Sequence, residues 1–407
     1  MLKVSSINLL LRIITLGSKF LLMMSMTKVL SPEEVGIYGI ISTSIGLAIY
    51  IIGMDFYVFN TREILGASNL KKEILIKDQF VFHLVSYTLF LPLIAVIFLI
   101  DVIPAKYILV FYIILIFEHL SQEFNRILIS LGKPILANIA LFFRSGSWAY
   151  IAIIAFFTFE EAQNLWVIFV GWLIGVIISN ILSVYYLRNL EWEEVKAKSL
   201  NWKWVRKGVL ISFPLFIGNI SLKLAEYLDR YFVTIYHGNS MTGVYTFYGS
   251  LSNLLVIFAQ TGVITILGPK TIKSFQNEEF EIYKKHMSKM IIGVTASTIL
   301  ISLILALGIL PIISIIDKPI YAEYLNAYWI LIVAYAFSVL SLLPHQALYV
   351  RYKDRVIILC SILSLVVALV LNIVLTPKYG LMGASMSTLS SFVFLFLLKL
   401  TFALKYT

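Results

Sequence analysis

The chain has 407 residues, of which 60% are hydrophobic and only 13% are charged, and its mean hydropathy is +0.92. Soluble domains are about half apolar and about a quarter charged, so this composition excludes a soluble domain whose whole surface faces water. The net charge is +10, and the single cysteine, Cys360, excludes an intrachain disulfide and a cysteine metal site. We therefore predict a polytopic membrane protein.

Apolar stretches of membrane-spanning length follow one another along the whole chain. A spanning helix needs about 20 apolar residues, and the alternating pattern of membrane barrels is absent. We predict an all-α integral membrane protein with about 12 transmembrane helices, the first of which is a retained span rather than a signal peptide. The predicted spans are residues 7–27, 36–58, 80–100, 107–128, 135–157, 165–187, 208–235, 243–266, 288–310, 325–345, 356–376 and 381–402.

The longest polar stretch, residues 188–207, lies between the sixth and seventh predicted spans. It predicts two six-helix domains, residues 1–195 and 196–407. Cytoplasmic loops of membrane proteins carry an excess of Lys and Arg. With both termini in the cytoplasm, the cytoplasmic segments hold 22 of the 32 basic residues and the outer loops hold four. The positive charge thus indicates topology in the cytoplasmic membrane rather than nucleic-acid binding.

Two short segments suggest that the halves arose by duplication. SPEEVGIYGIISTS follows the first span at residues 31–44, and GNSMTGVYTFYGSL follows the seventh at residues 238–251. Their offset of 207 residues, close to half the chain, also carries the third span onto the ninth. Because each half has an even number of spans, the two halves form a parallel, pseudo-symmetric repeat, in which the substrate path usually lies between the halves.

Basic residues interrupt three predicted spans at depths where a charge is costly. Arg12 and Lys19 are seven residues apart and share one face of the first helix. Arg144 lies near the middle of the fifth span, and Lys223 lies in the seventh. We predict that these four residues line a hydrated cavity that accepts an anion. Water and an anion would solvate and neutralise these positive charges, which would otherwise be unpaired within the apolar bundle.

The alternative is that the charges pair among themselves. Glu226 and Arg230 have the favourable i, i+4 order, so Arg230 is predicted to be a structural partner. Lys399 lies near a span end and is expected to snorkel to the interface. Glu226 and Asp229 are also candidate proton or sodium sites, since carboxylates within membranes often serve ion coupling.

The sequence contains no pattern typical of an enzyme. The five histidines are scattered without metal-ligand spacing, and there is no phosphate-binding glycine loop, nucleophile elbow or catalytic carboxylate pair. We therefore predict no catalytic residue, cofactor or metal site. A membrane glycosyltransferase or polysaccharide polymerase remains an alternative, but the longest predicted outer loop, residues 311–325, is too short for a catalytic domain.

Three segments resemble one family of membrane proteins. LSPEEVGIYGIIS after the first span, ISFPLFIGNISLKLAEYLDRYFVTIYHGNSMTGVYTF at the seventh and LVLNIVLTPKYGLMGASMSTLSSFVF at the last two are similar to motifs of Wzx-type oligosaccharide flippases. These form the polysaccharide transporter family of the multidrug/oligosaccharidyl-lipid/polysaccharide exporter superfamily. Lys28 and Thr376 depart from the common pattern without affecting the resemblance.

The resemblance implies a MATE-like arrangement of two six-helix bundles. It also implies translocation of an undecaprenyl-pyrophosphate-linked repeat unit for O-antigen, capsule or exopolysaccharide synthesis. The implied partners are this lipid-linked glycan, membrane lipid, a polysaccharide polymerase and chain-length machinery. An ion-coupled multidrug or small-molecule exporter is the alternative within transport. A cavity for cationic drugs would be acidic, however, whereas the charges at depth here are mainly basic.

Overall fold

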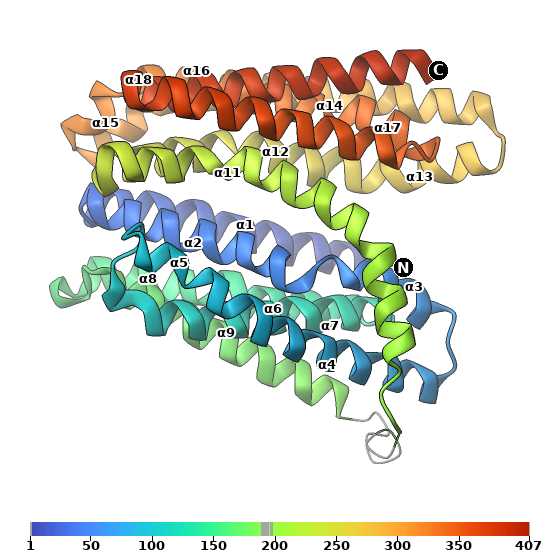
Figure 1. The fold of residues 1–407 in the computed structure, drawn as a ribbon. Helices are drawn as coiled ribbons and strands as arrows, with labels where there is room; N and C mark the ends of the chain where they lie inside the picture. The colour runs from blue at the N-terminus through green and yellow to red at the C-terminus, as the bar shows by residue number, and fades with distance from the viewer. Residues whose placement is uncertain (1, 189–194, 196–197, 407) are drawn as a thin grey trace. The chain divides into compact units, whose positions relative to one another are not determined.

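The computed structural model describes residues 2–188, 195 and 198–406, excepting the side chains of residues 2–10, 12 and 69. Every regular element in these ranges is a helix (Figure 1), and nine helical stretches there are long and apolar enough to cross a membrane. Two of the nine bend at glycines with positive φ, Gly238 and Gly380, and each arm is itself long enough to span. These helices confirm the predicted fold class, and α1 (Leu2–Val29) adds a further helix of 28 residues.

The chain forms two compact units. Unit 1 comprises Met1–Leu30 and Ile40–Phe216, and unit 2 comprises Ser31–Gly39 and Ile217–Thr407. The units follow the two halves of the chain with two exceptions. Residues 31–39, at the start of α2, belong to unit 2, and the first part of α11, up to Phe216, belongs to unit 1. The predicted domain boundary between residues 195 and 196 stays a prediction.

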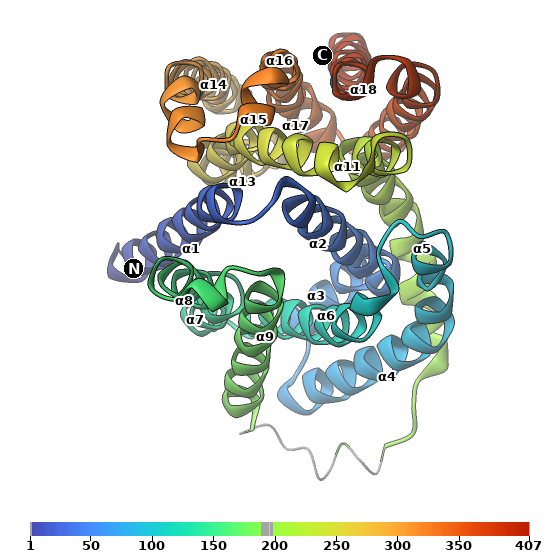
Figure 2. The same ribbon diagram turned by 90° about the vertical axis from the view of Figure 1, so that its left-hand side faces the viewer.

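Unit 1 is built mainly from helices of spanning length, which Figure 2 shows from another side. Its helices, including the parts of α2 and α11 that belong to it, are α1, α2 (Pro32–Gly53), α3 (Phe56–Leu65), α4 (Asn69–Ile94), α5 (Val96–Leu99), η1 (Ala105–Tyr107), α6 (Ile108–Ser130), α7 (Pro134–Phe142), η2 (Phe143–Ser147), α8 (Trp148–Thr158), η3 (Glu160–Ala162), α9 (Leu165–Leu187) and α11 (Trp202–Ser252). The segment η2 is a single π-helical turn that joins α7 to α8.

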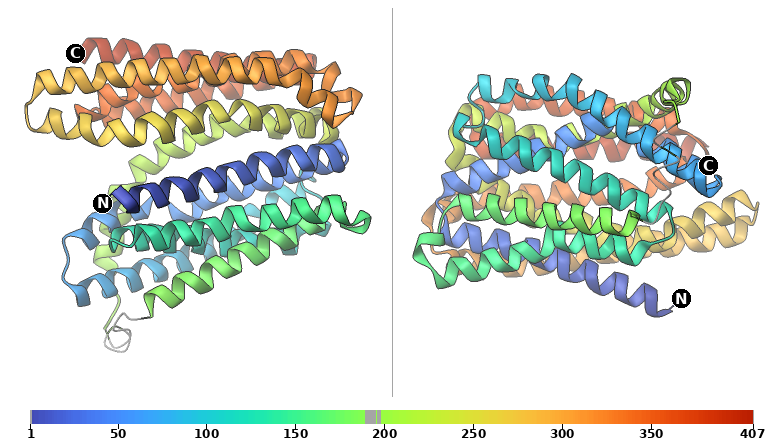
Figure 3. Two further views of the ribbon diagram at one scale, coloured as in Figure 1. Left: turned by 180° about the vertical axis from the view of Figure 1, so that it is seen from behind. Right: turned by 90° about the horizontal axis from the view of Figure 1, so that it is seen from below.

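Unit 2 continues from the second part of α11. Its further helices are α12 (Leu254–Ala259), η4 (Gln260–Ile264), α13 (Thr265–Gln276), α14 (Phe280–Ile316), α15 (Pro319–Glu323), α16 (Leu325–Leu340), α17 (Leu342–Val350) and α18 (Asp354–Tyr406). Figure 3 shows α13 and α14 as an antiparallel pair joined by a tight turn. At 1.5 Å per residue, α14 is about 55 Å long, so one end extends beyond a hydrocarbon core of about 30 Å.

The first turn of α2 explains why the motif SPEE begins a helix. Ser31 Oγ accepts a hydrogen bond from the backbone N–H of Glu34 at 3.2 Å. The Glu34 carboxylate in turn accepts bonds from the backbone N–H and the hydroxyl of Ser31 at 3.1 and 3.0 Å. This reciprocal arrangement is a capping box, and Pro32 suits the first helical position because its missing N–H would be unpaired there.

The two repeated motifs pack directly on each other within unit 2. A Cβ on Gly36 would lie 1.9 Å from the carbonyl oxygen of Asn239, and a Cβ on Gly243 would lie 1.9 Å from that of Pro32. Gly36 and Gly243 are 207 residues apart, the offset predicted for the repeat, and each meets the residue four places before the other. Equivalent positions of the two halves therefore contact each other symmetrically.

The second predicted span differs from the structure at its end. It was expected to continue to residue 58, but α2 ends at Gly53, and Met54 and Asp55 both adopt left-handed φ angles of 46° and 51° before α3 begins. The chain turns here because Phe56, the first residue of α3, packs against α4. Its ring stacks on that of Phe82 with centroids 4.4 Å apart. Burial of these aromatic rings in unit 1 offsets the cost of the strained turn.

Candidate functional site

A group of charged side chains in unit 1 joins α1, η2 and α6. Arg144 Nε lies 3.4 Å from Glu118 Oε1, and Trp172 Nε1 donates a hydrogen bond to Glu118 Oε2 at 3.1 Å. Lys19 lies within electrostatic range of both Arg144 and Glu118. The residue is accessible at the surface of α1 although protein atoms surround its ammonium group. Two bases lie near one acid, and only Arg144 is paired with it. The group therefore has an excess positive charge that can attract an anion. We call Lys19, Glu118 and Arg144 the basic site.

Small residues bring α1 close to the π-helical turn that carries Arg144. A Cβ on Gly146 would lie 3.4 Å from the Thr15 Cα, and the Ser18 hydroxyl reaches the Ser145 carbonyl at 3.5 Å. Tyr150 Oη donates to the Ile14 carbonyl at 2.9 Å. A π turn inserts an extra residue into a helix and is frequent at functional sites. Here it provides the local backbone that places Arg144 beside Glu118.

Charged residues on α11 form a second group, in unit 2. Lys223 Nζ donates to Glu226 Oε2 at 2.7 Å, and both side chains are partly exposed. Asp229 is buried, and its carboxylate accepts hydrogen bonds from Tyr245 Oη at 2.5 Å and Thr388 Oγ1 at 2.8 Å. The backbone N–H of Arg230 adds a third at 2.7 Å. These donors stabilise a buried carboxylate in an apolar bundle.

The structure can be compared with the predicted site residues one by one. It brings Lys19 and Arg144 together, and it places Lys223 beside Glu226 in the other unit. The Arg12 side chain lies outside the described residues. The expectation that Lys399 snorkels is wrong, because its side chain is only 2% exposed and its Nζ lies 3.5 Å from His345 Nδ1. The shared anion cavity and the ion-coupling role stay predictions.

Sequence reasoning missed the partner of Arg144. Glu118 lies on a different helix, and no pattern local to the fifth span reveals it. Its signal was the polar side of α6, where Glu118, Gln122 and Arg126 recur at spacings of four residues in an apolar span.

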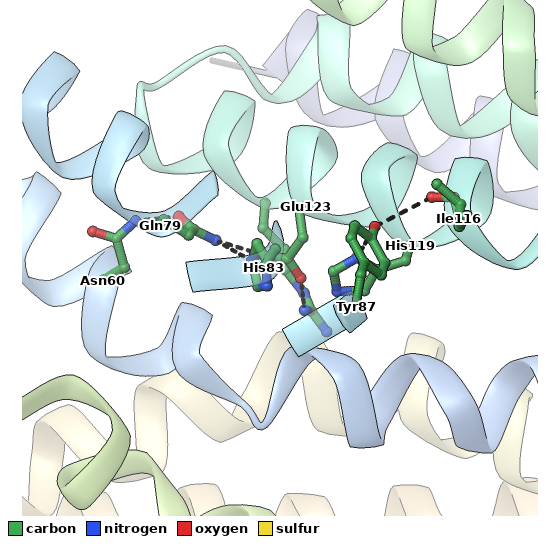
Figure 4. Close-up of polar contacts among 8 residues, drawn as sticks. Asn60, Gln79, His83, Tyr87, Ile116, His119 and Glu123 are labelled. Carbon is green, nitrogen blue, oxygen red and sulfur yellow. Dashed lines mark hydrogen bonds and ion pairs between the residues drawn. The ribbon is translucent and has the colours of Figure 1, made fainter. Parts of the chain in front are cut away.

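A second polar group that sequence reasoning missed lies between α4 and α6 in unit 1 (Figure 4). His83 Nε2 lies 3.4 Å from Glu123 Oε2, and the ring of His119 is edge-on to that of His83 at 4.7 Å. We call His83, His119 and Glu123 the histidine cluster. The available signal was the repetition of Gln79, His83 and Tyr87 every four residues along α4.

A cavity of about 180 Å³ lies between α3 and the first turns of α11, also in unit 1. It is lined by Val58, Phe59, Arg62, Glu63, Lys207, Ile211, Ser212 and Leu215. The Ser212 hydroxyl is buried and has no hydrogen-bond partner among the described residues. Two bases and one acid line it beside an apolar wall, which is the same charge balance as in the basic site.

Comparison with known proteins identifies the family. The profile of the polysaccharide biosynthesis protein family matches residues 1–269. The chain belongs to this family. No curated protein sequence matches it significantly. The family assignment agrees with the resemblance to oligosaccharide flippases that the three sequence motifs carry.

Solved structures show the same fold at low sequence identity. An inward-facing multidrug resistance transporter of the MATE family, in the MOP superfamily, matches with a TM-score of 0.76 and 12% identity, over 97% of this chain and 94% of that one. The lipid II flippase MurJ, in an inward closed conformation, matches with a TM-score of 0.69 and 16% identity, over 100% and 88%. The polysaccharide biosynthesis protein described here therefore has the helical fold that MATE transporters and MurJ share.

Proposed function

We propose that this protein translocates an oligosaccharide repeat unit, linked to undecaprenyl pyrophosphate, from the cytoplasmic to the outer leaflet of the cytoplasmic membrane. The observation that carries the proposal is the basic site, where Arg144 pairs with Glu118 and Lys19 adds a second positive charge nearby within an apolar bundle. A pyrophosphate carries negative charge and acceptor oxygens that would pair with these basic groups. Hydrogen bonds between charged groups are roughly twice as strong as neutral ones, so this pairing would favour binding.

Two further observations support this passenger. The family is one of polysaccharide biosynthesis, and one of the proteins that share the fold is a lipid II flippase. The cavity beside Arg62 and Lys207 offers a second place for a phosphate with an apolar tail. On this proposal, a polymerase and chain-length machinery would use the exported unit, and the protein itself would need no catalytic residue.

The rival is an exporter of cationic drugs, which the MATE neighbours suggest. The basic site disfavours it, because a cationic substrate would be repelled by Lys19 and would compete with Arg144 for Glu118. The two functions are separated by the charge of the passenger. Substitutions that make this site acidic should abolish glycan export, whereas they should favour the export of a cation.

The test is complementation of a strain that lacks the native protein. We expect Lys19→Glu and Arg144→Glu each to reduce surface glycan by at least about tenfold, since a like charge repels an anion. Lys19→Gln should weaken export less, and Lys19→Arg should be mildest. Surface glycan is normalised to the amount of variant in the membrane, and Lys106→Glu, at an exposed position of η1, is the control.

Full surface glycan in both glutamate variants, with normal membrane insertion, would refute the anion path. Accumulation of lipid-linked repeat units inside the cell is the second measurement. It should rise in the variants that lose surface glycan, because synthesis of the repeat unit continues while its translocation stops. Loss of glycan without this accumulation would place the defect before translocation and contradict the proposed role.

A further inference from the structure

The histidine cluster brings three metal-ligating side chains to one point in unit 1 (Figure 4). One ligand atom from each of His83, His119 and Glu123 lies within 4.8 Å of the other two. All three residues are at most 1% exposed. Polar side chains buried this deeply normally have hydrogen-bond partners. A ring nitrogen without a partner is therefore a candidate ligand for a metal ion.

Two of the four imidazole nitrogens have no hydrogen-bond partner among the described residues, namely His119 Nε2 and His83 Nδ1. His119 Nδ1 lies 2.7 Å from Tyr87 Oη, so Nε2 is the nitrogen left available. Gly53 is the residue that faces it, since a Cβ there would lie 3.4 Å from His119 Nε2 and 4.0 Å from Glu123 Oε1. The missing side chain leaves room beside an unpaired ligand atom.

The donor set is that of a zinc-like ion. Two imidazole nitrogens and one carboxylate oxygen bind such ions at about 2.0–2.2 Å in tetrahedral sites, which places neighbouring donors roughly 3.4 Å apart. His83 Nε2 and Glu123 Oε2 already have this separation. His119 Nε2 lies within 4.8 Å of both atoms, so binding requires a local shift of α6 or of the His119 side chain that shortens this separation.

Surrounding residues select which atoms of the ligands are available to an ion. Tyr87 Oη engages His119 Nδ1, which leaves Nε2 for an ion, and Arg126 Nη1 donates to Glu123 Oε1, which leaves Oε2 for the ion. Partners of this kind orient ligands at metal sites. The Arg126 charge opposes a cation, but Asp55, two residues after Gly53, adds a buried carboxyl at the same helix break.

A fourth ligand is available from Gln79. Its Nε2 now donates to Glu123 Oε2 at 2.6 Å and lies 3.3 Å from His83 Nε2, so its amide occupies the point where an ion would bind. Concerted half-turns of the amides of Gln79 and Asn60 direct Gln79 Oε1 to that point. Gln79 Nε2 then faces Asn60 Oδ1, an acceptor that lacks a partner among the described residues in the present arrangement.

We propose that His83, His119 and Glu123, with Gln79 as a fourth ligand, bind one divalent transition-metal ion of the zinc class. The ion fastens α4 to α6 beside the strained turn at Met54 and Asp55. This site is separate from the basic site, and the proposal does not depend on what the protein transports.

The test measures metal bound to the full-length protein in detergent, purified without a histidine tag. The protein is stripped with EDTA, dialysed against Zn²⁺ and analysed for metal content. We expect one Zn²⁺ per chain and an increase in thermal unfolding temperature on binding. His83→Gln and His119→Gln should each lower the affinity by roughly tenfold or more. His345→Gln, which changes a partly buried histidine in unit 2, should leave the affinity unchanged.

Cobalt substitution keeps the test decisive if a variant fails to fold. Co²⁺ bound to the wild-type protein should show tetrahedral visible bands and no thiolate charge-transfer band, because Cys360 is the only cysteine. A thiolate band would assign the metal to Cys360 and overturn the proposal. Less than about a tenth of an equivalent of Zn²⁺ in the wild-type protein, or equal binding by a folded His83→Gln/His119→Gln variant, would also overturn it.

Discussion

Lys19 is exposed although it lies in the middle of a predicted span. The acid near it, Glu118, is already paired with Arg144. Its ammonium group therefore needs water or an anion, since hydrocarbon would leave the charge unsolvated at a cost of several kcal/mol. Asp229 shows the opposite solution, because three protein donors satisfy a carboxylate that is only 3% exposed.

Asp229 is the residue whose neutralisation tests ion coupling. If a proton or sodium ion binds there during transport, Asp229→Asn should remove the dependence of export on the ion gradient while the protein still inserts. Export is measured in membrane vesicles with and without an imposed gradient. Glu323→Gln, an exposed acid on α15, is the control. Gradient dependence that persists in both Asp229→Asn and Glu226→Gln would restrict these acids to a structural role.

At the scale of helices, the contact between the two repeated motifs allows no side chain. Gly36→Ala or Gly243→Ala would place a methyl group 1.9 Å from a backbone oxygen, so the helices must separate. Overpacking of this kind costs about 1–3 kcal/mol. We expect each variant to have a lower unfolding temperature in detergent. Gly46→Ala, on α2 with nothing within 4 Å of the added carbon, is the matched control, and an equal effect there would contradict this explanation.

The sequence predicted helices well and their partners poorly. Apolar length predicted about 12 spans, and the SPEE and GNSM motifs predicted the repeat whose glycines meet in the structure, because both signals are local. Glu118 was missed because its pairing with Arg144 joins helices far apart in sequence. The histidines were judged scattered for the same reason, since His83 and His119 are on different helices and only folding brings them together.

At the scale of the whole molecule, the distribution of basic residues predicts which ends of the helices face the cytoplasm. In a Cys360→Ser background, cysteines at Lys198 and Lys285 should be inaccessible to a membrane-impermeant thiol reagent in intact cells. Cysteines at Glu161 and Glu323 should label. All four positions are exposed, so differences in labelling report the side of the membrane. Labelling at Lys198 from outside would contradict both the orientation and the parallel repeat.

The exchange of segments between the units has a consequence for biosynthesis. Residues 31–39 emerge from the ribosome early, but their packing surface around Gly243 belongs to chain made about 200 residues later. At 5–20 residues per second, the delay is roughly 10–40 s. During that time the side of α2 that carries Gly36 has no partner helix to pack against. The start of α2 therefore cannot complete its native packing until the seventh predicted span has been made.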